Sequence, residues 1–365
     1  MNTNSFYDAL LKEGISLFAG VPDSLLKEFC ACVTDRTDAL HNIITANEGN
    51  ALALAAGHYL ATGKPALVYL QNSGEGNLVN PLLSLVDEDV YKMPVLLVIG
   101  WRGEPGVHDE PQHVKQGKLT LELLKTMGIE HAVLEDVSQV ASACRYMQET
   151  EKPYALVVRK GTFDKYERKA SAEQTPSLPR EEAIKTVASL LGGRDIVVST
   201  TGMISRELYE NRASHEKDFL TVGSMGHASS IAMGIALNKP ERRGFVLDGD
   251  GAFLMHMGAC GVIASRNLPN FKHIVFNNEA HDSVGGQPTC VGSMELLKVA
   301  EGCGCTVRFS VSSVEELKAV WENFASTQAS AFLEIKVKKG ARTDLGRPKE
   351  KPVENKKAFM AFIQD

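Results

Sequence analysis

The 365-residue sequence contains no run of about 18 uninterrupted apolar residues, the length that a membrane-spanning helix requires. Its first residues also lack the basic flank and apolar core of a signal peptide. The seven cysteines are odd in number and scattered, which is typical of reduced thiols rather than of a disulfide framework. A formal net charge of −6 leaves no basic surplus for nucleic acid. We therefore expect a cytoplasmic protein with no membrane or nucleic-acid partner.

Two functional patterns are also missing. The Cys-x-Cys pairs that begin at Cys30 and Cys303 have no nearby histidine and no CxxC partner, so core packing is a better interpretation than metal binding. The glycine fingerprint of nicotinamide-binding domains does not follow the first expected strand, and the Gly74-Glu75-Gly76 segment lacks its third glycine. These absences disfavour a cysteine-ligated metal site and a nicotinamide-dependent oxidoreductase.

What the sequence does contain is a regular alternation of strand and helix patterns, with 44% apolar and 23% charged residues, as in ordinary globular proteins. In the first half we expect strands at residues 15–19, 41–45, 66–70, 95–99, 131–134 and 155–158, with helices that include 5–12, 49–61 and 119–127. Short apolar strands separated by helices predict a parallel sheet covered on both faces, an α/β fold.

The alternation is interrupted once. Residues 160–179 are rich in charge, serine and proline and are interpreted as a linker. Beyond them we expect strands at 195–199, 219–222, 245–247, 273–276, 306–309 and 332–337, and helices at 180–191, from 204, and at 228–237, 252–266, 294–301, 314–326 and 353–362. The length suits two domains. We place a first domain at 1–165, a linker at 166–179 and a second domain at 180–365.

The most informative stretch runs from Phe245 to Ser283. An apolar strand stops at Gly249-Asp250-Gly251, a helix pattern follows, and a second apolar strand ends in Asn277-Asn278. The 25 residues between Gly251 and Asn277 are about what a helix and a returning strand occupy in a βαβ unit. Because adjacent parallel strands end at one edge of a sheet, the aspartate and the asparagines are expected to converge there.

This edge has the chemistry of a magnesium–diphosphate site. Glycines at 249 and 251 let backbone N–H groups approach a phosphate, and the following helix directs its positive end to the same place. A carboxylate, an amide oxygen and a carbonyl are hard donors that suit an octahedral Mg²⁺ together with diphosphate oxygens and water. A Gly-Asp-Gly turn and an Asn-Asn turn in an unrelated α/β domain would be the alternative.

Gly-Asp-Gly followed at this spacing by Asn-Asn resembles the signature of thiamine diphosphate enzymes. The resemblance implies two doubly wound parallel-sheet domains, a pyrimidine-binding domain followed by a diphosphate-binding domain. It implies Mg²⁺ ligation by the side chains of Asp250 and Asn278 and by the backbone carbonyl of Ala280, with Asn277 in support. It further implies cofactor contacts from Gly249, Asp250, Gly251, Ala252, Asn278 and Ser283.

A second motif, TANEGNALALAAG, places Glu48 between a strand end and a helix start. By itself this is a first-turn glutamate favoured by the helix dipole. Enzymes of the family carry a glutamate at this place, so the resemblance implies that Glu48 hydrogen-bonds N1′ of the aminopyrimidine. Burial would raise the pKa of its carboxyl, which favours sharing a proton with that nitrogen.

A third motif, VGSMGHASS, is otherwise a core methionine between glycines. By resemblance the carbonyl of Gly223 accepts from the 4′-amino group, and Met225 supports the bent cofactor. Thr200 and Thr201 follow the first strand of the second half, where hydroxyls bind phosphate oxygens or cap helices with about equal frequency.

Within the family, the chain is most similar to two-domain decarboxylases of short acids that bear a second anion. The segments that carry this are GVPDSLL, ANEGNALALAAG, QNSGEGN, GWRGEPGVHDEPQHVKQG, GSMGHASSIAMGIAL, GDGAFLMHMG and NNEAHDSVGGQPT. The resemblance implies decarboxylation of 3-phosphonopyruvate to phosphonoacetaldehyde and CO₂, a step of phosphonate biosynthesis. Sulfopyruvate is the alternative substrate, and a catalytically silent cofactor-binding protein is the alternative from another functional class.

The remaining candidates lie in loops at strand ends of the first half. By resemblance, His113, Asp23 and Ser24 are candidates for proton transfer, while Arg102, His108 and Gln112 would bind substrate, and Asp23 or Ser24 could instead cap the next helix. Related decarboxylases carry a carboxylate six residues after the metal-binding asparagine, where this chain has Val284, and that change suits an anionic substrate. We also expect a homo-oligomer with active sites at subunit interfaces, as is usual in the family.

Overall fold

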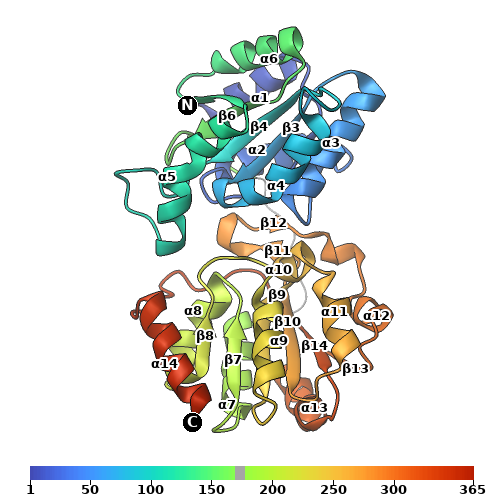
Figure 1. Cartoon of the computed structure of the whole chain (residues 1–365), viewed down its shortest axis with the longest axis vertical. Coiled ribbons are helices and arrows are strands. Elements are labelled where there is room, and N and C mark those ends of the chain that lie inside the picture. Colours follow the sequence, from blue (N-terminus) through green and yellow to red (C-terminus); the bar gives the residue numbers. More distant parts are fainter. Residues whose placement is uncertain (169–176) are drawn as a thin grey trace. The chain divides into compact units, whose positions relative to one another are not determined.

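The computed structural model describes residues 1–168 and 177–365. Part of the expected linker, residues 169–176, lies outside this description. The chain divides into two compact units, Met1–Ser171 (unit 1) and Ala172–Asp365 (unit 2). Figure 1 shows that each unit is built around its own sheet with helices on both faces.

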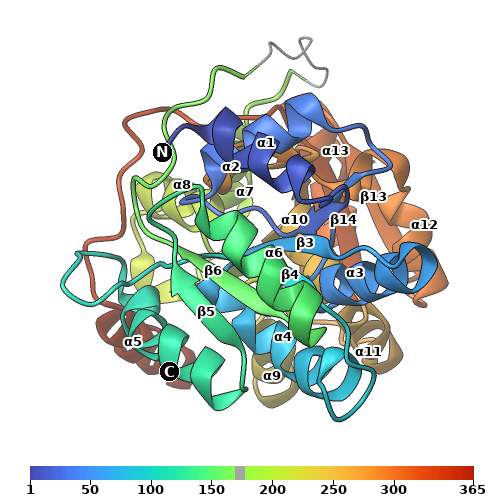
Figure 2. The ribbon, with the colours of Figure 1, turned by 90° about the horizontal axis from the view of Figure 1, so that it is seen from above.

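The sheet of unit 1 has six parallel strands in the order β2-β1-β3-β4-β6-β5. Four of them, β5, β6, β4 and β3, can be followed side by side in Figure 2. The strands are β1 (Phe18–Gly20), β2 (Asn42–Ile44), β3 (Ala66–Gln71), β4 (Val95–Gly100), β5 (Glu130–Val133) and β6 (Tyr154–Val158). The helices are α1 (Thr3–Lys12), α2 (Lys27–Arg36), α3 (Glu48–Thr62), α4 (Glu75–Pro81), α5 (Pro111–Thr126) and α6 (Gln139–Thr150), with short helical turns at Asn72–Gly74 and Leu82–Val86.

Alternation along the buried strands divides the core of unit 1 into two layers. In β3, Leu67 and Tyr69 pack with α1, α2 and α6, whereas Val68 and Leu70 pack with α3, α4 and α5. Because successive side chains of a strand point to opposite faces, a strand that is apolar throughout requires helices on both sides. The prediction of a doubly covered parallel sheet is confirmed for this unit.

Unit 2 repeats this plan, with the parallel strand order β13-β14-β10-β9-β7-β8. Its strands are β7 (Ile196–Ser199), β8 (Asp218–Leu220), β9 (Gly244–Gly249), β10 (Phe271–Asn277), β13 (Val307–Val311) and β14 (Ala331–Lys336), and an antiparallel pair is formed by β11 (Ala280–His281) and β12 (Gln287–Pro288). The helices are α7 (Arg180–Leu190), α8 (Met203–Asn211), α9 (Ala228–Asn238), α10 (Asp250–Met255), α11 (Ala259–Arg266), α12 (Leu296–Gly302), α13 (Val314–Ser326) and α14 (Pro352–Gln364), with single turns at His215–Lys217, Asp282–Val284 and Cys290–Ser293.

The two faces of this sheet are again covered by different helices. One core layer joins α7, α8 and α13 to residues such as Phe245 and Leu247, and the other joins α9 and α11 to Val246. Both units therefore have the predicted α/β architecture. Among the described residues, no helix has the length and apolar character that crossing a membrane would require.

Three local predictions were wrong. The single helix expected at 252–266 is two helices, because His256 leaves the helical backbone (φ −133°, ψ 44°) and Gly258, a weak helix former, lies in the gap. Helix α5 begins at Pro111, well before residue 119, so Gln112 and His113 lie in its first turn rather than in a loop. The N-cap of α2 is Leu26, with no side-chain cap from Asp23 or Ser24.

A carboxyl group without a counter-charge is buried where β3 leads into α4. Glu75 is 4% exposed, and its Oε1 has no hydrogen-bond partner among the described residues. Burial raises the pKa of Glu75 to about 8, against a smaller opposing effect of Thr120. The preceding residue, Gly74, lies against Glu48, so this buried carboxyl is next to a candidate site residue.

The raised pKa predicts how stability changes with pH. The folded chain holds the Glu75 proton more tightly than the unfolded chain does, so this group's stabilising contribution is complete below about pH 4.5 and is lost as pH rises to about 8. Glu75→Gln is expected to flatten that decline. Urea unfolding midpoints at about pH 5 and about pH 8.5 would measure it. Substitution of exposed Glu122 on α5 by glutamine is the control, and equal slopes for both variants and the unaltered protein would contradict the prediction.

Candidate functional site

Glu48 is the first residue of α3 and lies just beyond the carboxyl end of β2. Asn47 caps the helix by accepting from the backbone N–H of Gly49 at 2.8 Å, which sets the direction in which Glu48 leaves the chain. The Glu48 carboxyl is 4% exposed and accepts a 2.7 Å hydrogen bond at Oε2 from Asn77 Nδ2. Burial raises its pKa, although the bond from Asn77 opposes this.

The second oxygen of Glu48 lies against Gly74. A Cβ at position 74 would come within 2.2 Å of Glu48 Oε1, a distance that no real side chain could adopt. Glycine is therefore required at this turn for the carboxyl to occupy its place. The arrangement holds one carboxyl oxygen by a neutral amide and contributes no positive charge to it, which suits a group that exchanges a proton.

Asp23 follows β1 and is completely buried. Its carboxyl accepts hydrogen bonds from Gln71 Nε2 at 2.5 Å and from the backbone N–H of Leu25 at 2.8 Å. Burial raises the pKa of Asp23 against these bonds and the charge of Arg102. Since Gln71 ends β3, the neighbour of β1, two strand ends meet at this carboxyl.

Arg102 follows β4 and is already engaged on three sides. Its Nε and Nη2 donate to the two oxygens of Asp109 at 2.7 and 2.5 Å, and its Nη1 donates to Ser24 Oγ at 2.8 Å. Although burial acts in the other direction, these bonds hold the pKa of Asp109 well below its usual range. Asp109 thus anchors the loop that follows β4, and the Arg102 guanidinium is held in place where it contacts Ser24.

The remaining candidates of unit 1 differ in exposure. His113 is buried in the first turn of α5, its Nδ1 has no partner among the described residues, and burial together with Arg102 lowers its pKa to about 4. Gln112 has a buried Oε1 that is likewise without a partner there. His108 is exposed in the loop before α5. Unit 1 therefore joins Asp23, Ser24 and Arg102 by direct contacts, but not His108.

In unit 2, β9 ends at Gly249 and Asp250 opens α10. Asp250 is 2% exposed, and its Oδ2 accepts a 2.5 Å hydrogen bond from Thr289 Oγ1. Burial raises its pKa to about 6. A Cβ at position 251 would lie 2.9 Å from Cε1 of His281, so glycine is required for the close approach of α10 and β11.

The Asn277–Ala280 turn lies beside this carboxylate. Asn277 ends β10 and donates from Nδ2 to Glu334 Oε1 at 2.8 Å, which agrees with a supporting position. Asn278 Oδ1 accepts from the backbone N–H of Ala280 at 3.1 Å. Thr289 joins the two segments, because its hydroxyl binds Asp250 while its backbone N–H donates to the Glu279 carbonyl at 3.1 Å.

These contacts fit the donor set that a magnesium–diphosphate group requires. The described residues include no cluster of three or more His, Cys, Asp or Glu side chains that could hold a metal. One carboxylate, one amide and one carbonyl instead leave most of the coordination to the ligand's phosphate oxygens and to water, which is typical of Mg²⁺.

The other expected cofactor residues of unit 2 have different neighbours. The Cε of Met225 lies 3.5 Å from the position of a Cβ at Gly251, and Ser283 Oγ lies 2.8 Å from that of a Cβ at Gly202. Thr201 Oγ1 donates to the carbonyl of Val222 at 2.8 Å and so fastens the segment that carries Gly223. Thr200 is buried after β7, and Ala252 lies in the first turn of α10.

Sequence reasoning missed the side chains that hold the candidates in place: Asn77 on Glu48, Gln71 on Asp23, Thr289 on Asp250 and Asp282 on Asn278. All four lie within the segments QNSGEGN and NNEAHDSVGGQPT. Their polar composition was visible, but a pattern of letters does not reveal which donor faces which acceptor.

Comparison with known proteins identifies both units. Residues 3–124 match the family model "Thiamine pyrophosphate enzyme, N-terminal TPP binding domain", and residues 199–335 match "Thiamine pyrophosphate enzyme, C-terminal TPP binding domain". The two matches follow the order of the units in the chain.

Curated relatives cover nearly the whole chain. Phosphonopyruvate decarboxylase from Streptomyces viridochromogenes is 32% identical over 96% of this chain and 92% of its own. Sulfopyruvate decarboxylase from Methanosarcina acetivorans is 28% identical over 91% of this chain and 90% of its own. The beta subunit of sulfopyruvate decarboxylase from Methanocaldococcus jannaschii is 37% identical, but over 40% of this chain and 76% of its own. The predicted resemblance is confirmed, and the chain belongs to the thiamine diphosphate enzymes and, among them, to the 2-oxo acid decarboxylases.

Proposed function

We propose that the protein catalyses the decarboxylation of 3-phosphonopyruvate to phosphonoacetaldehyde and CO₂, with thiamine diphosphate and Mg²⁺, as a step of phosphonate biosynthesis. The observation that carries this proposal is the similarity to phosphonopyruvate decarboxylases over nearly the full length of both chains. Sulfopyruvate is the second candidate substrate, because a full-length sulfopyruvate decarboxylase is also similar, at lower identity.

Thiamine diphosphate, when bound, supplies the electron sink that makes loss of CO₂ from a 2-oxo acid possible. Unit 2 would hold its diphosphate and Mg²⁺ through the side chains of Asp250 and Asn278 and the carbonyl of Ala280. The buried, uncompensated carboxylate of Asp250 supports this assignment, since a cation repays the cost of its burial.

In unit 1, Glu48 would bind N1′ of the aminopyrimidine. Burial raises its pKa, which favours sharing a proton with that nitrogen, and Asn77 fixes the carboxyl while Gly74 leaves it space. Glu48 therefore keeps or gives up a proton at one defined ring atom, which is general acid–base work.

Substrate would be bound by Asp23, Ser24 and Arg102, which follow strands β1 and β4 of unit 1. Asp23 and His113 are the candidate proton donors there: burial raises the pKa of Asp23, which favours its protonated form, whereas burial lowers the pKa of His113 to about 4, which favours its neutral form. Arg102 would bind the second anion through the N–H groups that Asp109 and Ser24 leave unused, with His108 just before α5 and Gln112 in its first turn. Val284 in unit 2 adds no negative charge that would repel that anion.

We further propose a homo-oligomer in which each active site combines the pyrimidine-binding unit of one subunit with the diphosphate-binding unit of another. The sulfopyruvate decarboxylase relatives include separate alpha and beta subunits, and each of them matches less than half of this chain, which supports an assembly of more than one chain.

A side-by-side rate measurement tests the substrate. We expect CO₂ release from 3-phosphonopyruvate, in the presence of thiamine diphosphate and Mg²⁺, with a kcat/KM at least about tenfold above that for sulfopyruvate, since an extra charge on the second anion changes its binding by about 1.4 kcal/mol or more. A higher kcat/KM for sulfopyruvate would instead identify sulfopyruvate as the substrate. No CO₂ from either acid, with cofactor binding intact, would identify a silent cofactor-binding protein.

A complementation experiment tests the proposed site residues and the shared site together. Glu48→Gln and Asp250→Ala are each expected to lower kcat by roughly 10²–10⁴, because each removes one end of the cofactor's attachment. If subunits exchange freely, a mixture of the two variants is expected to regain roughly a quarter of the activity, since half of the dimers would contain one unaltered site of two.

The exposed pair Glu122→Gln and Asp136→Ala provides the matched control, and both variants are expected to keep full activity. Two outcomes would contradict the proposal. Full activity of either Glu48→Gln or Asp250→Ala would remove that residue from the site, and no recovery on mixing, with exchange shown by differently tagged chains, would refute sites shared between subunits.

A further inference from the structure

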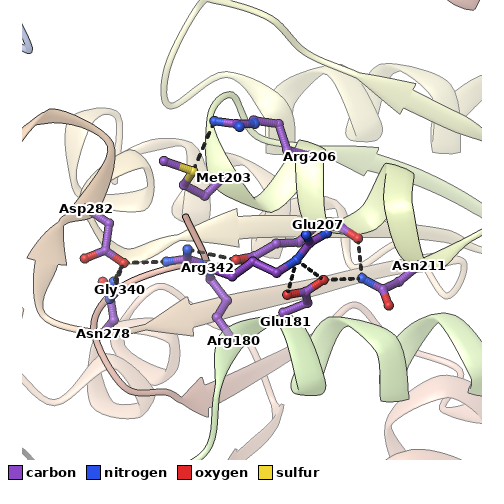
Figure 3. Close-up of polar contacts among 10 residues, drawn as sticks. All are labelled: Arg180, Glu181, Met203, Arg206, Glu207, Asn211, Asn278, Asp282, Gly340 and Arg342. Atoms are coloured by element: carbon purple, nitrogen blue, oxygen red, sulfur yellow. Dashed lines mark hydrogen bonds and ion pairs between the residues drawn. The ribbon is translucent and has the colours of Figure 1, made fainter. Parts of the chain in front are cut away.

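A buried ion network stands directly behind the Asn277–Ala280 turn. Figure 3 shows Arg180, at the start of α7, placed between Glu207 of α8 and Asp282 of the turn after β11. Its Nε and Nη2 donate to the Glu207 carboxylate at 2.9 and 3.0 Å, and its Nη1 donates to Asp282 Oδ2 at 2.7 Å. One guanidinium thus holds two carboxylates in a fixed relation.

The same oxygen of Asp282 accepts two further hydrogen bonds. Asn278 Nδ2 donates to it at 2.6 Å, and the backbone N–H of Gly340 donates at 3.0 Å. We call Arg180, Glu207, Asp282 and Gly340 the Asp282 clamp. Its charged side chains are 5%, 1% and 10% exposed, so solvent screens them little and their geometry is held tightly.

The clamp selects one orientation of the Asn278 amide. A carboxylate only accepts hydrogen bonds, so the amide must turn its Nδ2 to Asp282 and its Oδ1 to the other side. There Oδ1 receives the N–H of Ala280, which occupies one lone pair and leaves a second for a cation. In the reversed orientation, Asn278 Nδ2 would face the cation. The Nδ2 group would also face the backbone N–H of Ala280, so that two hydrogen-bond donors would lie against each other.

We propose that Asp282, held by Arg180 and Gly340, is the positioning residue that presents the Asn278 oxygen to Mg²⁺. This inference rests on the proposed function only in taking Asn278 as a ligand of the Mg²⁺–diphosphate group. Partners behind a metal ligand commonly contribute 10–100-fold to metal affinity. Asp282 itself does not touch the ion; it acts through Asn278.

A neighbouring network of similar composition provides the control. Arg342 pairs with Glu181, Glu210 and Asp344, and Glu181 also accepts from Asn211 at 3.0 Å. Glu181 follows Arg180 in α7, and its hydrogen bonds among the described residues are with Asn211 and Arg342 rather than with Asn278. Glu181→Gln therefore removes a carboxylate next to Arg180 in α7 and leaves the drawn contacts of the Asn278 amide in place (Figure 3).

The test is a calorimetric titration of Mg²⁺ into protein saturated with thiamine diphosphate. We expect Asp282→Ala to weaken Mg²⁺ binding by about 10–100-fold. Asp282→Asn, which retains an acceptor oxygen but not the charge, is expected to weaken it less. Glu181→Gln should bind Mg²⁺ as the unaltered protein does. Excess Mg²⁺ should restore kcat to Asp282→Asn, and the melting temperature of the metal-free protein should change by only a few degrees.

Unchanged Mg²⁺ affinity in both Asp282 variants would overturn the proposal, as would equal weakening by Glu181→Gln. If Asp282→Ala does not fold, Asp282→Asn decides alone, because its shape is that of the native side chain. Failure of the proposed function looks different. An unaltered protein that binds Mg²⁺ with thiamine diphosphate but releases no CO₂ would refute the substrate, while the weakened binding of the Asp282 variants would still support the clamp.

Discussion

The buried carboxylate of Asp250 is the constraint on which the rest of the site depends. In the part of the chain that the structure describes, its contacts are a hydroxyl and backbone N–H groups, and burial raises its pKa to about 6. A desolvated anion without a cation is expensive, and a bound divalent ion would remove that cost. Within those residues, the Asp250 carboxylate has no cationic partner. Its position is set by the strand end, by the glycines on either side and by the Asn278 turn.

The protein places different kinds of groups around the residues expected at the two ends of the cofactor. Around Asn278 the protein uses charged groups, since Arg180, Glu207 and Asp282 form a rigid ionic frame. Around Glu48 it uses a neutral amide and an absent side chain at Gly74. A metal ligand must be fixed in direction, whereas a proton-exchanging carboxyl must keep a raised pKa, which a nearby cation would lower. The different environments therefore match the different chemical tasks.

Much of this arrangement could be predicted from the sequence because the residues come directly after apolar strands, and the order of strands fixes where they lie. Asp250 and Asn278 follow two apolar strands that were evident from composition, and parallel pairing brings such residues to one edge. Glu48 was proposed as a site residue by the same reasoning together with the family resemblance. The helix break at His256 was not predicted, since local propensity there is helical up to Gly258.

What could not be predicted depends on pairing between distant residues. Arg102 was expected to bind an anionic substrate, but in the structure it already contacts Asp109 and Ser24. No periodicity in the sequence indicates such a pairing. Glu75 lies in a segment that resembles a solvated turn, yet the packing of α4 and α5 buries it. The Asp282 clamp joins residues about one hundred positions apart, and only the fold brings them together.

The most direct test of the central claim, that one cofactor is held by Asp250 at its diphosphate and by Glu48 at its ring, is a crystal structure of the assembled protein with thiamine diphosphate and Mg²⁺. We predict an octahedral ion bound by Asp250, Asn278 and the Ala280 carbonyl, with N1′ within hydrogen-bond distance of Glu48. A diphosphate bound away from Asp250, or a ring nitrogen with no contact to Glu48, would contradict the account.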